Sequence, residues 1–192
     1  MATKGIQTKQ FIIDTSIRLF SEKGYSNVTM KDVCEACNLS RGGLYRHFNS
    51  TKEIFIDMLN SHKDNAKNLL DESIKENISA RQMLEYFLNQ QKSEIQSEYS
   101  GLDFAIHEFA FVEKDQHDYM NKRYNSAITI LSKLIDYGQS KNEFKKCNST
   151  ILATHIMFLF DSMKTSAPVL ILTDNDIDNQ INLIKDMVIL YE

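Results

Sequence analysis

The chain predicts an all-α protein, and three observations lead to this fold class. It has one proline and six glycines in 192 residues, so few positions interrupt a helix. Its hydrophobic content of 42% is sufficient for a buried core. Its apolar residues recur at spacings of three and four, which is the period of amphipathic helices.

Residues 29–48 read TMKDVCEACNLSRGGLYRHF and carry the clearest local signal. Thr29 has the spacing of a capping box and begins a short helix. A turn follows at 37–39, where Asn tolerates an unusual backbone angle. Ser40 then caps a second helix, which we expect to end at about His47. The stretch has the form of a DNA-reading helix-turn-helix.

In this second helix Leu44 and Phe48 lie four residues apart and are expected to face a small core. The polar side chains are left for the exposed side: Arg41, Tyr45, Arg46 and His47. The adjacent Gly42 and Gly43 each cost a helix about 1 kcal/mol relative to alanine. A backbone that must approach another surface, such as the major groove of DNA, explains why both are glycine.

The flanking helices have their own signals. The first is expected from about Thr8 to Lys23, with Gly24 in the left-handed conformation that ends a helix. Ser50 and Glu53 repeat the capping spacing and begin a fourth helix.

The charge distribution also favours DNA binding by the N-terminal part. A net charge of −4 for the whole chain would by itself argue against a nucleic-acid partner. Residues 1–52, however, contain eight basic and four acidic residues, a net charge of +4, so the other 140 residues carry −8. This asymmetry predicts that DNA contacts the N-terminal end alone. The alternative is a surface fluctuation without a function.

Residues 6–66 resemble the DNA-binding domain of the tetracycline-repressor (TetR) family of bacterial regulators. The matching pieces are LFSEKGYSNVTM, KDVCEACNLS and GLYRHF followed by KEIF. The resemblance implies a helix-turn-helix motif at 29–48, a C-terminal effector-binding and dimerisation domain at 67–192, and about nine helices in total.

The resemblance also implies which residues contact DNA. Carried over by position, these are Thr29, Lys31, Ser40, Arg41, Gly42, Gly43, Tyr45, Arg46, His47, Thr51 and Lys52. The family often has a phosphate-binding lysine three positions after the HF pair. Here Thr51 holds that position and Lys52 follows it, so the sequence leaves open which of the two reaches the phosphate.

The C-terminal part predicts further helices at about 79–97, 102–112 and 148–166, with a long helix closed near Gly138 and a last one that Asp174 opens as its cap. The segment 102–112 is apolar nearly all round, which predicts a central buried helix. Pro168 either ends or kinks the helix before it.

The last helix has two apolar stripes. One consists of Ile177, Ile181, Ile184, Val188 and Tyr191, and the other of Leu183, Met187 and Leu190. One stripe can pack on the domain and the other on a partner, or both can be internal core. The family resemblance implies a homodimer through the last two helices.

The resemblance further implies a small-molecule pocket in the C-terminal domain. The candidate effector-binding residues are Phe87, Phe104, His107, Glu108, Phe111, Tyr124 and His155. The aromatic members can equally be plain core, whereas a polar group on an apolar helix needs a partner or a ligand. These residues suit a small, largely apolar molecule.

Other functions find little support in the chain. Cys34 and Cys37 have metal-ligand spacing but lack a second pair, and the histidines have no metal-binding spacing, so we expect no metal, no cofactor and no enzyme. The chain has no apolar run of membrane-spanning length and no signal peptide, and its three cysteines fit a reducing compartment, which predicts a cytoplasmic protein.

Together these features predict a homodimeric repressor that binds palindromic double-stranded operator DNA and is released by a small effector. One alternative is a DNA-binding regulator that activates transcription or answers to a protein partner. Another is a small helical enzyme or lipid-binding protein.

Overall fold

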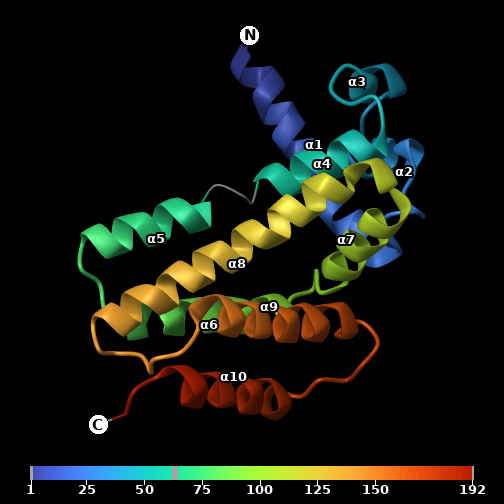
Figure 1. Ribbon diagram of the computed structural model, residues 1–192. Coiled ribbons are helices and arrows are strands. Elements are labelled where there is room, and N and C mark those ends of the chain that lie inside the picture. The colour runs from blue at the N-terminus through green and yellow to red at the C-terminus, as the bar shows by residue number, and fades with distance from the viewer. Residues whose placement is uncertain (1, 62–64, 192) are drawn as a thin grey trace. The chain divides into compact units, whose positions relative to one another are not determined.

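The computed structural model describes residues 2–61 and 65–191, and the all-α prediction is confirmed there. In the described ranges the chain forms ten α-helices and one 3-10 turn (Figure 1). The helices are α1 Ala2–Lys23, α2 Met30–Ala36, α3 Arg41–Tyr45, α4 Thr51–Ser61, α5 Asn65–Lys75, α6 Ala80–Ile95, α7 Gly101–Val112, α8 His117–Ser140, α9 Ser149–Ser166 and α10 Asp174–Val188. The helix beyond the expected nine is α5.

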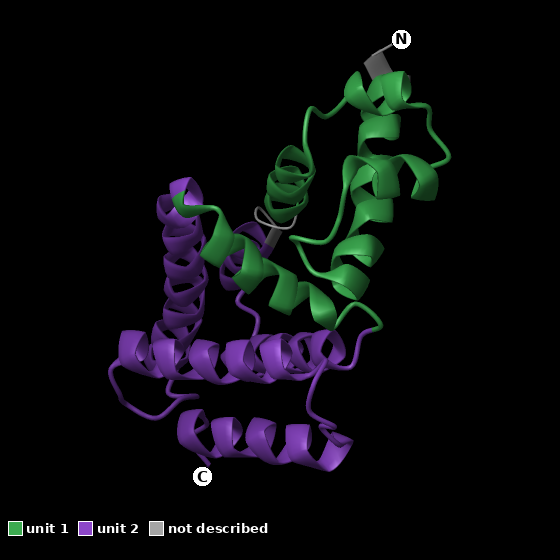
Figure 2. Ribbon diagram, turned by 90° about the vertical axis from the view of Figure 1, so that its right-hand side faces the viewer, with its two compact units in different colours: residues 1–64, 98–114 green, residues 65–97, 115–192 purple. Residues whose placement is uncertain are grey.

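The helices pack into two compact units, coloured separately in Figure 2. Unit 1 contains residues 1–64 and 98–114, and unit 2 contains residues 65–97 and 115–192. Helix α7 therefore packs with α1 to α4, although a long stretch of sequence separates it from them. The domain ranges 6–66 and 67–192 remain a prediction.

The local signals of the helix-turn-helix are confirmed. Thr29 and Asp32 form a complete capping box at the start of α2. Asn38 has a positive φ of 52° in the turn, and the Ser40 side chain accepts a hydrogen bond from the backbone N–H of Gly43 at 3.1 Å. Helix α3 ends at Tyr45, two residues before the expected end at His47.

Helix α1 differs from its expected extent at one end. It begins at Ala2, earlier than the predicted Thr8, and runs through Lys23. Gly24 ends it with a φ of 77°, as predicted. Because this angle is strained for residues with a Cβ atom, the tight exit from α1 depends on glycine.

Aromatic side chains form the centre of unit 1. Phe20 and Tyr25 come from α1 and the turn after it, Phe55 from α4 and Phe109 from α7. The Phe55 ring meets Phe20 edge to face at 4.7 Å and stacks on Phe109 at 4.8 Å between ring centroids. Burial of aromatic rings is a large hydrophobic contribution to stability, so this cluster binds the three helices together.

Unit 2 is built on a pair of antiparallel helices, α8 and α9, with α6 packed against both. Helix α10 runs alongside α9 in Figure 1 and adds its buried face to the same core. Near the start of α9 the Ser132 hydroxyl lies 3.1 Å from that of Ser149. At the other end of the pair, Tyr124 of α8 stacks on Phe158 of α9.

Three helix ends in unit 2 differ from the sequence prediction or decide a point that it left open. Helix α8 runs past Gly138 to Ser140. A Cβ at Gly138 would meet the Phe144 ring at 2.2 Å, so the packing of that ring explains glycine at this position inside the helix. Thr173, and not Asp174, caps α10, since its hydroxyl accepts the hydrogen bond from the N–H of Asp176. Helix α9 ends at Ser166, so Pro168 follows the helix and does not kink it.

Helix α10 presents its two apolar stripes to different surroundings. Its buried residues are Ile177, Ile181, Ile184 and Val188. Leu183 and Met187 are exposed, as are Leu190 and Tyr191, which follow the end of α10 at Val188.

The prediction of a central buried helix at 102–112 is wrong. In α7 the buried side chains are Ala105 and Phe109, whereas Phe104, Phe111 and Val112 are exposed. The apolar composition of this helix is therefore not explained by the core of unit 1.

Over residues 2–61 and 65–191, none of the helices is sufficiently long and apolar to cross a lipid bilayer.

Candidate functional site

Helix α3 presents a polar outer face. Leu44 and Phe48 are buried against the rest of unit 1, as predicted. Arg41, Tyr45 and Arg46 are exposed, and His47 is half-buried. Because Arg41 and Tyr45 lie one helical turn apart, their side chains share one face of α3.

Most of the described basic side chains of residues 1–52 are already paired with carboxylates. The ammonium and guanidinium groups bond to acids within unit 1 in the pairs Lys9–Asp57 at 2.6 Å, Arg18–Glu22 at 2.7 Å, Lys23–Asp32 at 2.5 Å and Lys52–Glu113 at 2.9 Å. Among the described side chains, Arg41 and Arg46 pair with no carboxylate. The positive charge that the sequence distributes over residues 1–52 is thus uncompensated at α3.

Lys31 is only loosely paired with a carboxylate. It lies 3.7 Å from Glu35 on the outside of α2, and both side chains are largely exposed. An exposed pair at this distance contributes little, so Lys31 can exchange Glu35 for a phosphate at low cost.

Thr29 and Ser40 have structural roles at helix N-termini. The hydroxyl of each accepts the backbone N–H of the residue three positions later. The Lys23 ammonium and the Thr29 hydroxyl hold the pKa of Asp32 well below its usual range, so the capping carboxylate stays ionised at neutral pH. Any contact of Thr29 or Ser40 with DNA has to coexist with these bonds.

The two glycines of α3 differ in their surroundings. A Cβ added at Gly42 would meet nothing within 4 Å, so packing does not require glycine there. A Cβ at Gly43 would lie 3.3 Å from the Ser40 hydroxyl, which is tight for the capping bond. Gly42 therefore fits the prediction that the backbone of α3 is kept bare for another surface.

Thr51 and Lys52 open α4, and both are half-buried. The Lys52 ammonium bonds to Glu113, the residue after α7, so a phosphate would compete with that carboxylate. Thr51 is the first residue of α4, and its position at the helix N-terminus suits an anion. The arrangement favours Thr51 over Lys52 as the phosphate contact.

Glu108 of α7 and Glu113, which directly follows α7, fasten this helix to the DNA-binding helices. Glu108 accepts the backbone N–H of Tyr25 at 2.6 Å and that of Ser26 at 3.2 Å. Glu113 accepts the Tyr25 hydroxyl at 2.6 Å in addition to pairing with Lys52. Sequence spacing could not reveal these bonds, since Tyr25 and its partners are 83 and 88 residues apart.

The predicted effector residues on α7 therefore differ in their contacts and exposure. Glu108 bonds to the backbone of the turn after α1, while Phe104, His107 and Phe111 are exposed, Phe111 by 81% of its surface.

In unit 2 the predicted effector residues lie in two aromatic pairs and one exposed position. Phe87 of α6 meets Phe160 edge to face at 6.0 Å, and Tyr124 stacks on Phe158 at 5.7 Å. His155 is exposed on α9. The assignment of all seven residues to an effector pocket stays a prediction.

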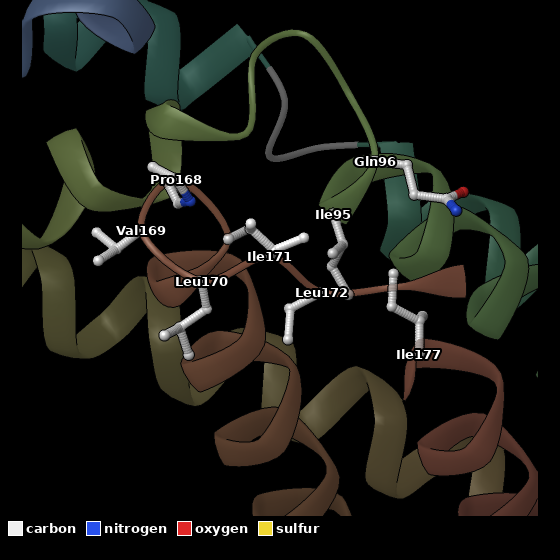
Figure 3. A pocket seen from close by; sticks show the side chains of 9 residues that line it. Ile95, Gln96, Pro168, Val169, Leu170, Ile171, Leu172 and Ile177 are labelled. Carbon is white, nitrogen blue, oxygen red and sulfur yellow. The ribbon is translucent and has the colours of Figure 1, made fainter. Parts of the chain in front are cut away.

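A hollow of about 300 Å³ lies elsewhere in unit 2 (Figure 3). It is formed by the end of α6, the loop after α9 and the start of α10, and its walls include Ile95, Leu170, Ile171 and Ile177. Ile171 is 95% exposed beside it. None of the predicted effector residues lines this hollow.

Two of the cysteines belong to the helix-turn-helix. Cys34 and Cys37 are buried in α2 and at its C-terminal end, and burial raises the pKa of the Cys37 thiol. In the described ranges no group of three or more His, Cys, Asp or Glu side chains is placed to hold a metal ion.

Comparison with protein families gives two matches. A family model described as bacterial regulatory proteins of the tetR family matches residues 12–58. A second model, described as a tetracyclin-repressor-like C-terminal domain, matches residues 83–178, which is half of the chain.

Similar proteins include helix-turn-helix regulators from two bacteria. The chain is 27% identical to the uncharacterised transcriptional regulator YfiR of Bacillus subtilis over 136 residues, which is 70% of this chain and 66% of that protein. It is 47% identical over 47 residues, 24% of this chain and 25% of the other, to IcaR of Staphylococcus aureus, a negative regulator of the biofilm operon icaADBC. The chain thus covers less than two thirds of the length of both relatives.

Solved structures agree over nearly the whole chain. Escherichia coli NemR in its reduced form superposes with a TM-score of 0.78 at 15% identity and covers 95% of this chain and 97% of its own. A transcriptional regulator from Saccharomonospora viridis, solved in complex with choline, has a TM-score of 0.78 at 17% identity and covers 96% and 99%. At these identities the likeness concerns the fold.

Proposed function

Because this chain belongs to the tetracycline-repressor family of bacterial regulatory proteins, we propose that it is a sequence-specific DNA-binding transcriptional regulator. The observation that carries the proposal is the pair of arginines on α3, Arg41 and Arg46, which are exposed and pair with no carboxylate among the described side chains. Such uncompensated guanidinium groups suit guanine edges and phosphates.

The residues around α3 have distinct roles in this proposal. Arg41 and Arg46 read base edges in the major groove, with the backbone at Gly42 close to the DNA surface. Tyr45, Lys31 and the N-terminus of α4 at Thr51 contact phosphates and fix the position of α3.

The regulator acts as a homodimer on a palindromic operator. Leu183 and Met187 on α10 and Leu190 just after it are exposed, and Ile151 is exposed on α9, so an apolar surface is available to a second copy. Two copies related by a two-fold axis would place two α3 helices on successive major grooves.

The likeness to IcaR, which is a negative regulator, supports repression as the mode of action. The solved regulator that holds choline supports a small-molecule effector, and the exposed aromatic side chains suit one that is largely apolar. In this proposal effector binding releases the protein from its operator.

Helix α7 is the element that connects effector binding to DNA binding. Glu108 accepts a backbone hydrogen bond from Tyr25 in the turn after α1. Glu113 accepts a hydrogen bond from the Tyr25 hydroxyl and forms an ion pair with Lys52 at the start of α4. A displacement of α7 therefore pulls on the two helices that position α3.

A titration tests this function. DNA flanking the gene of the protein is first screened by gel shift to find the operator, and a compound that releases the protein is then titrated with and without that DNA. Coupling of this kind is about 1–3 kcal/mol and reciprocal, so operator DNA must weaken effector binding by the factor by which effector weakens DNA binding. Equal effector affinity with and without operator DNA would contradict the proposed coupling between effector and DNA binding. Failure to bind any of the screened DNA would contradict the proposed DNA-binding function.

A further inference from the structure

Lys52 occupies a helix position that disfavours a cation. It is the second residue of α4, which begins at Thr51. The N-terminal turn of a helix carries a partial positive charge, so it stabilises an anion and not a lysine. The acid of the same turn, Glu53, accepts the backbone N–H of Asn49 at 2.7 Å. A cation at this point therefore needs an anion from outside the helix.

Glu113, directly after α7, supplies that anion. Its Oε2 lies 2.9 Å from the Lys52 ammonium, and its Oε1 accepts the Tyr25 hydroxyl at 2.6 Å. Tyr25 is buried, and its ring meets those of Phe55 and Phe109 edge to face at 5.0 and 4.9 Å between centroids. The packed tyrosine thus holds the carboxylate in place against Lys52.

The Lys52–Glu113 pair is better shielded from solvent than its counterparts in unit 1. Its two side chains are 29% and 23% exposed. In four other pairs of unit 1 the cation is at least 42% exposed: Lys9–Asp57, Arg18–Glu22, Lys23–Asp32 and Lys31–Glu35. Salt screens partly buried pairs less than exposed ones, so this pair is expected to persist at physiological ionic strength.

A carboxylate and a DNA phosphate offer the same chemistry to a lysine, because both are anionic acceptors of ammonium hydrogen bonds. In the proposed function Thr51, the neighbour of Lys52, contacts a phosphate at the N-terminus of α4. The ammonium group next to that phosphate is the one that Glu113 binds. The same helix end thus has a carboxylate that competes with DNA.

Building on the proposed function, we propose that Glu113 is an autoinhibitory residue that limits the affinity for operator DNA. Its carboxylate takes the place of a backbone phosphate on Lys52. A phosphate gains Lys52 only by displacing a carboxylate that Tyr25 also holds. Loss of the negative charge at position 113 therefore adds Lys52 to the DNA contacts.

The first arm of the test compares Glu113→Gln with the wild-type protein on the operator found by gel shift. The amide oxygen still accepts the Tyr25 hydroxyl, but the side chain carries no charge. The variant should bind about fivefold or more tightly. Its logarithmic affinity should fall more steeply with the logarithm of the salt concentration, by about 0.9 per subunit, because one more phosphate is neutralised. A purely structural Glu113 predicts weaker binding instead, since a bond between α4 and the end of α7 is lost.

The second arm is a double-mutant cycle with Lys52→Met, which removes the ammonium group and keeps an unbranched apolar side chain. This change should cost about fivefold more affinity in the Glu113→Gln background than in the wild type, because Lys52 contacts DNA only in that background. Asp71→Asn is the matched control for net charge, since it breaks the Lys133–Asp71 pair of unit 2 and removes the same negative charge. The control should leave the salt dependence unchanged, because no lysine joins the DNA contacts.

Several results would overturn the proposal. Equal or weaker operator binding by folded Glu113→Gln, an unchanged salt dependence, a gain that Asp71→Asn matches, or an equal effect of Lys52→Met in both backgrounds would each do so. Circular dichroism identifies the folded variants. If Glu113→Gln is unfolded, Glu113→Asp replaces it, because it withdraws the charge by one methylene and should give a smaller gain of the same sign. Failure of the wild-type protein to bind any screened DNA would contradict the proposed function, and this proposal with it.

Discussion

At the scale of single residues, the polar side chains of the helix-turn-helix divide between those that hold the fold and those that remain available. Thr29, Asp32 and Ser40 are occupied in caps, and Lys23 and Lys52 are occupied in ion pairs. Arg41 and Arg46 take no part in these bonds. This division identifies the side chains whose replacement should change DNA binding while leaving the fold intact.

Gly42 gives a prediction in which stability and function change in opposite directions. Gly42→Ala should raise the free energy of unfolding by up to about 1 kcal/mol, because the added Cβ meets nothing within 4 Å and alanine favours helix. The same methyl group should weaken operator binding if the backbone of α3 approaches DNA closely. Urea unfolding and gel shifts measure the two effects.

Gly43→Ala is the comparison for this prediction, since its Cβ would lie 3.3 Å from the Ser40 hydroxyl and should gain less stability. Operator affinity that is unchanged in Gly42→Ala would mean that the glycine serves no DNA contact.

The sequence predicted the capping residues because a cap is a local arrangement. Thr29 and Ser40 act on residues three positions away, so spacing alone identifies them. It could not predict that Lys52 is paired with Glu113, or that Glu108 bonds to Tyr25. These contacts join distant segments and depend on how α1, α4 and α7 pack.

At the scale of helices, the attachment of α7 to α1 is the main feature of unit 1. Gly101 begins α7 at a point where a Cβ would lie 2.1 Å from the backbone carbonyl oxygen of Ser21. Glu108 and Glu113 fasten the other half of the helix. Helix α7 is therefore fixed at both ends to the helices that carry the DNA-binding motif.

Gly101→Ala should accordingly be destabilising. A clash with backbone cannot be relieved by rotating a side chain, so α7 must shift and the loss should be about 1–3 kcal/mol or more in the free energy of unfolding. Gly42→Ala serves as the control for the effect of alanine on a helix. Chemical denaturation followed by circular dichroism would detect the difference, and equal stability of Gly101→Ala and wild type would contradict the close packing of α7 on α1.

Periodicity predicted most helices but not the surroundings of each. The apolar residues of 102–112 predicted a buried helix, yet Phe104 and Phe111 are exposed. Hydrophobic composition reports that a helix has apolar faces, and it does not report what covers them. The stripes of α10 illustrate the same point, since both are apolar and only one is buried.

At the scale of the whole molecule, the proposed function requires two copies of the chain. The exposed stripe of α10 gives this a direct test, because two neighbouring residues differ in burial: Met187 is 38% exposed and Ile184 is 1% exposed. A charge at position 187 faces solvent in the monomer, whereas a charge at position 184 enters the core.

Met187→Asp should therefore yield helical monomers with weakened operator binding, because one half-site alone is weakly held. Ile184→Asp should instead unfold the protein, since a buried carboxylate without a partner is strongly unfavourable. Light scattering and circular dichroism distinguish these results. A wild-type protein that is monomeric at micromolar concentration would contradict the dimer.

The central claim is that α3 reads DNA through its two unpaired arginines, and operator binding by Arg41→Ala and Arg46→Ala tests it most directly. Arg18→Ala is the control, because Arg18 is exposed on α1 and paired with Glu22. Each α3 variant should lose about 1–3 kcal/mol of binding free energy, confined to particular bases if the arginine reads a guanine, while the control binds like wild type. Equal affinity of all three variants and wild type would contradict the claim.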